Sequence, residues 1–267
     1  MDGAYGKNGT IDMWYSLLAY LKFLLTSTNH HGVHSPFVYD LVTKCFYNRS
    51  YFPQYEAIKT YRDNLTRNKQ LLSVTDLGSG SKQDESMVKL VSQIAQTAGT
   101  TYKRAKLLMR LVQYFQPHTI LELGTSLGIA TQAMHLGNSN SKITSIEGCP
   151  NISEFTQNQI KSLRNIKLLT GDFNLYLSHL NSNKWDFVFF DGNHNKAATL
   201  EYFEALLPTK QNNSVFIFDD IYWSKGMTEA WELIKQHPEV RVTIDTYFWG
   251  FVFFRNEQVK EHFKIRL

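Results

Sequence analysis

Two patterns of hydrophobic and polar residues divide the chain near residue 119. Before it, apolar residues recur at helical spacing, as in Leu17, Leu21 and Leu24, which predicts helices joined by turns. After it, short runs rich in β-branched and aromatic residues alternate with segments of helix length. The predicted strands are 119–124, 142–148, 166–173, 185–192, 214–220, 240–247 and 250–255. We therefore expect a helical N-terminal extension or lid over 1–100 and a second domain over 101–267.

The strand pattern predicts an α/β fold. Near-continuous apolar strands separated by helices are typical of a parallel sheet that is covered on both faces. The runs 240–247 and 250–255 are too close together for a helical crossover, so they must form a hairpin, which places one antiparallel strand in the sheet. The expected architecture is a doubly wound, Rossmann-like sheet with its ligand at the carboxyl ends of the strands.

The N-terminal part predicts helices over 12–27, 84–97 and 101–115. The first has an apolar face, but it is interrupted by Lys22 and is too short to span a bilayer. We expect it to pack on the protein or on a second copy in a homodimer, with a membrane-surface helix as the alternative. It resembles no signal peptide, and two cysteines cannot form a disulfide framework, so a cytoplasmic location is expected.

The net charge of +4 is unevenly distributed. Residues 1–118 carry 14 Lys and Arg against 8 Asp and Glu, whereas the rest carries 14 against 16. A basic front half can face an anionic partner, but its basic residues are not clustered and do not alternate with aromatic residues. Nucleic acid is therefore not the favoured partner.

The segment LELGTSLGIAT, residues 121–131, predicts a tight turn between a strand and a helix. Gly124 and Gly128 allow the backbone there to approach a ligand closely and to adopt positive φ. Their spacing matches neither the dinucleotide-binding G-x-G-x-x-G nor the P-loop, which argues against those ligands. A purely structural turn is the alternative.

Acidic residues end the next two predicted strands. Glu147 can accept both hydroxyls of a ribose, and Asp172, after Gly171, can accept a hydrogen bond from an adenine amino group. Each alone can also be a helix N-cap or a solvated loop acid. Their occurrence at successive strand ends is more specific than either residue alone.

These residues together carry a resemblance. E-x-G-T-x-x-G, an acid after the second strand and G-D after the third are similar to the class I methyltransferases that use S-adenosylmethionine (SAM). The resemblance implies a seven-stranded sheet whose last strand is antiparallel. It also implies that SAM is bound by Glu122, Gly124, Thr125, Ser126, Gly128, Glu147, Gly148, Gly171, Asp172 and Asp191.

Three acids end the fourth and fifth strands. Asp191 lies in FFDGNHN, and Asp219 and Asp220 lie in FIFDD. Carboxylates so close together repel one another unless a cation lies among them. Oxygen ligands without a nearby cysteine favour Mg²⁺. Helix capping and shared protons are the alternatives.

The pattern D-G-x-H followed by D-D resembles metal-dependent O-methyltransferases that act on sugar and aromatic hydroxyls. It is also similar to the catechol and caffeoyl-coenzyme A group, in which a Trp and a Gly follow, as Trp223 and Gly226 do here. The resemblance implies Asp191, Asp219 and Asp220 as metal ligands, Asp191 also being catalytic, and His194 as the base. Asn193, at the position of the base in some relatives, cannot take a proton.

We therefore expect an enzyme that transfers a methyl group from SAM to a hydroxyl oxygen of a small molecule, such as a catechol, a vicinal diol or a sugar. The alternatives are a methyltransferase acting on RNA or protein and a non-catalytic scaffold with the same fold. A nicotinamide-dependent dehydrogenase is disfavoured, because the glycine spacing is wrong.

Three other features have less specific interpretations. The segment 74–81, which contains DLGSGS, is expected to be a structural or substrate-side loop. The segment NHHGVHSPF is expected to form a capped, packed turn rather than a metal site. Tyr102, Lys103 and Lys106 directly precede the first strand, which suggests that they reach the cofactor pocket.

Overall fold

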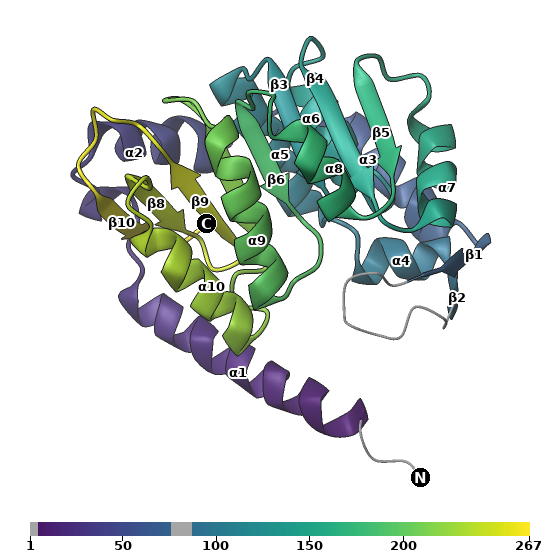
Figure 1. The fold of residues 1–267 in the computed structure, drawn as a ribbon, viewed down its shortest axis with the longest axis horizontal. Coiled ribbons are helices and arrows are strands. Elements are labelled where there is room, and N and C mark those ends of the chain that lie inside the picture. The colour runs from purple at the N-terminus through teal and green to yellow at the C-terminus, as the bar shows by residue number, and fades with distance from the viewer. Residues whose placement is uncertain (1–4, 76–86) are drawn as a thin grey trace.

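The fold is taken from a computed structural model, which describes residues 5–75 and 87–267, with side chains from residue 14 onward (Figure 1). The N-terminal elements are α1 (Tyr5–Thr26), α2 (Pro36–Leu41), a π-helical turn (Val42–Phe46), α3 (Gln54–Arg67), β1 (Leu71–Val74), β2 (Met87–Leu90), α4 (Val91–Thr97) and α5 (Tyr102–Phe115). The following elements are β3 (Thr119–Leu123), α6 (Ile129–Gly137), β4 (Lys142–Glu147), α7 (Pro150–Ile160), β5 (Ile166–Thr170), α8 (Phe173–Leu180), β6 (Phe187–Phe190), α9 (Lys196–Leu206), β7 (Val215–Asp219), α10 (Lys225–Gln236), β8 (Val242–Asp245), β9 (Trp249–Phe253) and β10 (Glu261–Lys264).

The central sheet has the strand order β10-β8-β9-β7-β6-β3-β4-β5. All neighbours pair in parallel except those of β9, which is antiparallel to both β7 and β8. The predicted α/β class, the Rossmann-like sheet and the hairpin are therefore confirmed. The sheet has eight strands rather than seven, because β10 adds in parallel to β8, with Phe263 opposite Ile244.

The alternation of side chains along the strands builds a core on each face of the sheet. Phe187 and Phe189 of β6 belong to the cluster that α2, α5 and α6 cover. Val188 and Phe190 belong to the cluster that α8, α9 and α10 cover. The sheet is thus doubly wound, and its carboxyl edge remains open where the strand order reverses between β3 and β6.

The N-terminal part contains a small antiparallel sheet as well as helices. Leu71 pairs with Leu90, and Val74 pairs with Met87. The helix predicted over 84–97 is therefore wrong for Met87–Leu90, which extend along β1, and the helix begins at Val91. Residues 84–86, and residues 76–81 of the predicted glycine-rich loop, lie outside the described residues. The helix predicted over 101–115 is confirmed as α5.

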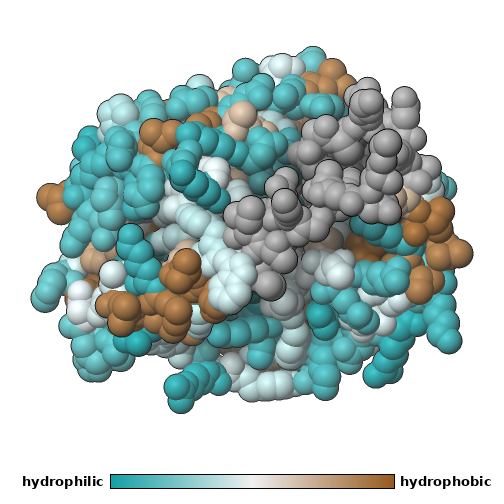
Figure 2. All heavy atoms as spheres, turned by 90° about the horizontal axis from the view of Figure 1, so that it is seen from below, coloured by the Kyte–Doolittle hydropathy of each residue, from teal (hydrophilic) through white to brown (hydrophobic). Residues whose placement is uncertain are grey.

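Helix α1 packs below α10 in Figure 1 and contacts the loops of the central sheet. Phe23 is buried there, and the Tyr247 hydroxyl donates a 2.7 Å hydrogen bond to the Ser16 carbonyl. The opposite face is exposed and apolar, and Figure 2, viewed from the side of α1, shows hydrophobic side chains gathered at lower left. That face carries Trp14, Leu17, Leu18, Leu21 and Leu25. No helix in the described part of the chain is long and apolar enough to cross a membrane.

Candidate active site

A cavity of about 450 Å³ lies at the carboxyl ends of β3 to β7. It is lined by ten of the predicted site residues, namely Gly124, Ser126, Glu147, Gly148, Gly171, Asp172, Asp191, His194, Asp219 and Asp220. Three others, Glu122, Thr125 and Gly128, are not part of its lining. The topology thus gathers at one edge acids that are up to 73 residues apart in the chain, from Glu147 to Asp220.

The turn after β3 brings two strand ends into close approach. Gly124 has φ +100°, and its backbone N–H donates a 2.9 Å hydrogen bond to the Ile146 carbonyl. A Cβ atom at Gly124 would overlap the carbonyl oxygen of Asp191, so only glycine lets the ends of β3 and β6 lie this close. Gly128, with φ +74°, precedes α6 and packs against Thr156.

Glu147 ends β4 and ties two loops to the cavity. Its carboxylate accepts hydrogen bonds from the backbone N–H groups of Ser126 (2.8 Å) and Cys149 (2.9 Å). Burial raises the pKa of Glu147, and these backbone donors, with that of Gly148, act in the opposite direction. The carboxylate is held in one orientation while it still lines the cavity.

Glu122 lies beneath the cavity and is fully buried. Its Oε2 accepts hydrogen bonds from the hydroxyls of Thr131 (2.6 Å) and Ser145 (2.5 Å), and Ser145 lies 2.5 Å from the Thr125 hydroxyl. Its Oε1 has no hydrogen-bond partner among the described residues. Burial raises the pKa of Glu122 to about 7, so the group exchanges its proton near neutral pH.

The residues that follow β5 fit both interpretations made from the sequence, a helix N-cap and a cofactor-binding acid. Gly171 has φ +142°, and its N–H donates to the Glu147 carbonyl at 2.9 Å. Asp172 is the N-cap of α8, since its side chain accepts a 2.7 Å hydrogen bond from the Asn174 N–H. Asp172 also lines the cavity, so a residue that caps α8 can still contact a bound ligand.

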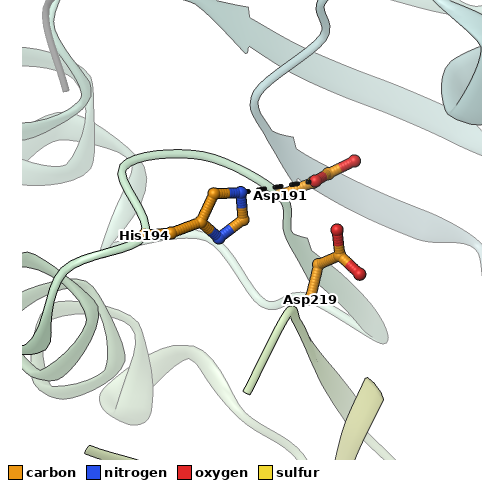
Figure 3. Close-up of side chains that lie close together, drawn as sticks. All are labelled: Asp191, His194 and Asp219. Carbon is orange, nitrogen blue, oxygen red and sulfur yellow. Dashed lines mark ion pairs between the residues drawn. The ribbon is translucent and has the colours of Figure 1, made fainter. Parts of the chain in front are cut away.

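The acids after β6 and β7 converge with a histidine (Figure 3). Asp191, His194 and Asp219 each offer a ligand atom within 4.8 Å of the others, and His194 Nε2 lies 3.9 Å from Asp191 Oδ1. Burial and the negative charge of Asp219 raise the pKa of Asp191 well above its usual value. The same two causes raise the pKa of Asp220 to about 6. This crowding of negative charge fits a divalent cation held by oxygen ligands.

Two side chains that the sequence did not indicate contact these acids. Arg104 of α5 lies 3.5 Å from Asp219 Oδ1 through Nη1 and 3.6 Å from Asp220 Oδ1 through Nη2. The Trp249 indole donates a 2.6 Å hydrogen bond to Asp219 Oδ1. A cation in the first turn of a helix is unfavourable beside the helix dipole, which was the one available signal for Arg104. Two neighbouring basic residues, Lys103 and Lys106, obscured this signal.

The prediction that Tyr102, Lys103 and Lys106 reach the pocket is wrong, because none of them lines the cavity. The Tyr102 hydroxyl donates to the Tyr55 carbonyl, and the Lys106 ammonium lies 4.5 Å from the centre of the Tyr102 ring. The Lys103 ammonium donates to the Leu267 carbonyl. Successive helical residues point about 100° apart, and Arg104 is the one in this turn that faces the acids.

The N-terminal part supplies one wall of the cavity. This wall consists of Val74, Thr75, Met87, Lys89 and residues 97–100. Trp223, which is 60% exposed, stands at the rim beyond Asp220. The histidine-rich turn is instead a capped structure, with Asn29 accepting from the His31 N–H and Ser35 accepting from the Val38 N–H. It contributes no ligand to the one cluster of metal-binding type found among the described residues.

Comparison with known proteins agrees with this geometry. Residues 121–221 match a family model described as a methyltransferase domain. No curated protein matches the chain significantly. The fold is similar to an O-methyltransferase from Bacillus cereus in complex with SAH (17% identity, 79% of this chain and 95% of that chain covered, TM-score 0.52). It is also similar to an SAH-bound methyltransferase from Podospora anserina (14% identity, 84% and 97% covered, TM-score 0.58).

A third similar structure is a putative caffeoyl-CoA O-methyltransferase from Staphylococcus aureus (15% identity, 61% of this chain and 88% of that chain covered, TM-score 0.54). At these identities the solved structures establish the fold. The family match covers residues 121–221, which include β4 to β7, and it agrees with the resemblance to class I methyltransferases found in the motifs.

Proposed function

We propose that this protein transfers a methyl group from SAM to a hydroxyl oxygen of a small molecule, with the help of a divalent cation and a histidine base. The observation that carries the proposal is that Glu147 and Asp172 line the same cavity as Asp191, Asp219 and Asp220. The titles of similar structures, which name O-methyltransferases and bound SAH, support the reaction class.

The cofactor half of the proposal uses the ends of β3, β4 and β5. Glu147 accepts the ribose hydroxyls, Asp172 faces the adenine, and the Gly124 turn with Ser126 lies along the methionine part. Glu122, Thr125 and Gly128 act from behind this surface, by holding the turn in place. When bound, SAM supplies an electrophilic methyl group on a positively charged sulfur. The cavity volume is within the usual range for small-molecule sites.

In this proposal the divalent cation is bound at the ends of β6 and β7. Asp191, Asp219 and Asp220 are the ligands we propose, because carboxylate oxygens suit Mg²⁺ and similar ions. A divalent cation, when bound, lowers the pKa of an acceptor hydroxyl and orients it. Two adjacent oxygens can chelate one ion, so a catechol, a vicinal diol or a sugar is the acceptor class we propose.

His194 is the base in this proposal. Its imidazole lines the cavity beside Asp191, where it can take the hydroxyl proton of a bound acceptor. A histidine that coordinates the ion cannot also take this proton, so we assign coordination to the three carboxylates. Holding donor and acceptor in reactive contact contributes roughly 7–11 kcal/mol to lowering the barrier.

The test is methyl transfer from radiolabelled SAM to catechols, glycosides and RNA, with Mg²⁺ or with EDTA. We expect transfer to a small hydroxylated acceptor that EDTA abolishes and added Mg²⁺ restores. Asp219→Asn should lose this activity and keep SAM binding, whereas Glu229→Gln, a change at a partly exposed acid of α10 that pairs with Lys196, should keep both. Full turnover in EDTA would contradict the metal half, and transfer to RNA alone would contradict the acceptor class.

Three expectations stay predictions. The first is that the N-terminal part, residues 1–100, forms the wall of the cavity beside the methyl acceptor and acts as a lid. A homodimer would cover the exposed apolar face of α1, and the cytoplasm is the expected location. Light scattering of the full chain and of Leu18→Glu tests the dimer, since the exposed Leu18 makes no contribution to the core.

A further inference from the structure

We infer that Arg104 and the divalent cation compete for Asp219 and Asp220, so that the guanidinium neutralises these acids until the cation displaces it. This inference rests on the proposed function, because it concerns the same metal site. It adds a residue, from outside the α/β units, that sets how tightly the cation is held.

One guanidinium bridges both acids. Nη1 of Arg104 lies 3.5 Å from Asp219 Oδ1, and Nη2 lies 3.6 Å from Asp220 Oδ1. The planar fork of arginine suits such a bridge, whereas the single ammonium of lysine does not. Asp219 Oδ1 also accepts the Trp249 hydrogen bond, so this oxygen already has two positively polarised partners.

The guanidinium also contacts an aromatic ring. Its Cζ lies 4.3 Å from the centre of the Phe248 ring, which is the geometry of a cation–π contact. Phe248 follows Tyr247, which has φ +72° and stacks on Tyr222 with ring centres 5.1 Å apart. The Phe248 ring therefore helps to hold the Arg104 guanidinium beside Asp219 and Asp220.

The consequence for a cation is electrostatic. A divalent ion that uses the carboxylates of Asp219 and Asp220 meets a positive charge already paired with both, and like charges at such separations repel strongly. Metal binding must therefore weaken or break the Arg104 ion pairs. Arg104 lowers metal affinity, and it keeps the acids compensated when no cation is bound.

The experiment measures Mn²⁺ affinity by electron paramagnetic resonance of free Mn²⁺, at pH 8 and without SAM. It compares the full-length protein with Arg104→Gln, Arg104→Lys and the matched control Lys103→Gln. The control removes one charge from the same helical turn, at a side chain that contacts the Leu267 carbonyl and not the acids. Thermal unfolding and SAH binding verify that each variant is folded.

We expect Arg104→Gln to bind Mn²⁺ about tenfold more tightly, or about 1.4 kcal/mol. Arg104→Lys should show a smaller gain, and Lys103→Gln should stay within about twofold of the parent. If Arg104→Gln does not fold, the Arg104→Lys gain carries the test. Unchanged or weaker binding in folded Arg104 variants, with the parent binding Mn²⁺, overturns this inference and leaves the proposed function intact. Absence of Mn²⁺ binding in every variant overturns both.

Discussion

The Trp249 indole donates a 2.6 Å hydrogen bond to Oδ1 of Asp219, the residue that lies opposite it in the antiparallel pair of β7 and β9. Both side chains are buried. Strand β9 of the hairpin thus orients Asp219, which ends the neighbouring strand β7. Removing a hydrogen-bond partner of this kind from a metal ligand typically lowers metal affinity or activity by about 10–100-fold.

Replacing Trp249 by Phe should therefore weaken metal binding. The phenyl ring keeps most of the packing but cannot donate to Asp219, so we expect Mn²⁺ affinity and turnover to fall roughly 10–100-fold. SAH affinity, measured by calorimetry, should stay within about twofold, since Trp249 does not line the cavity. Trp185→Phe is the control, because it removes an indole that donates to the Leu180 carbonyl. Equal Mn²⁺ affinity in the two variants would refute the role of Trp249.

Glu147→Gln should reduce cofactor affinity. The change removes the charged acceptor and places an amide near the backbone N–H of Ser126 or Cys149, which donate to the carboxylate. Hydrogen bonds to charged groups contribute about 1.5–3 kcal/mol, so we expect the SAH dissociation constant to rise roughly 10–100-fold. Glu154→Gln, at an exposed acid of α7, is the control for calorimetry. An unchanged constant for Glu147→Gln would show that Glu147 does not bind the ribose.

Gly124→Ala should destabilise the protein and abolish SAH binding. A side chain at φ +100° is strained, and its Cβ would overlap the Asp191 carbonyl, so the ends of β3 and β6 must separate. Strain of this kind costs about 1–3 kcal/mol, which lowers the melting temperature by several degrees. The control is Gly226→Ala in α10, where the nearest atom is 3.5 Å away and we expect little change. A normal melting temperature and normal SAH binding in Gly124→Ala would contradict this account of the turn.

The stability of the protein should depend on pH through Glu122. Its pKa is about 7 in the folded protein and 4.5 ordinarily, so the folded state binds more protons between these values. The free energy of unfolding must then fall as pH rises from about 4.5 to about 7. Relative to Glu122→Gln, the wild type should lose on the order of 1–3 kcal/mol between pH 5 and pH 8.

Urea unfolding at several pH values measures this difference. Gln can accept the hydrogen bonds of Thr131 and Ser145 as Glu122 does, so the comparison isolates the ionisation. Glu201→Gln, at an exposed acid, should follow the wild type at every pH. A wild type that gains stability over Glu122→Gln with rising pH would have the wrong sign and would contradict the raised pKa.

The order of strands and helices from Thr119 to Phe253 could be predicted because most of these strands are buried on both faces and read as apolar runs. Parallel pairing then places Glu147, Asp191 and Asp219 at one edge without further information. β10 was not predicted, because Glu261–Lys264 is short and largely polar. Met87–Leu90 was predicted as helix, because its pairing with Leu71–Val74 is a tertiary contact that the local pattern does not encode.

The side chains that orient the acids were also missed. Arg104 lies 115 residues before Asp219, and Trp249 lies 30 residues after it, in elements whose pattern indicates only helix and strand. A motif records the residues at the strand ends, but not those that approach them from neighbouring elements. Their positions follow from the packing of α5 and β9 against the sheet.

A crystal structure of the protein grown with SAH and Mn²⁺ would locate the cofactor and the ion together, the ion by its anomalous scattering. We expect the nucleoside between Glu147 and Asp172, and one Mn²⁺ peak coordinated by Asp191, Asp219 and Asp220. A Mn²⁺ peak elsewhere with these acids still paired to Arg104, or SAH bound away from Glu147, would contradict this expectation.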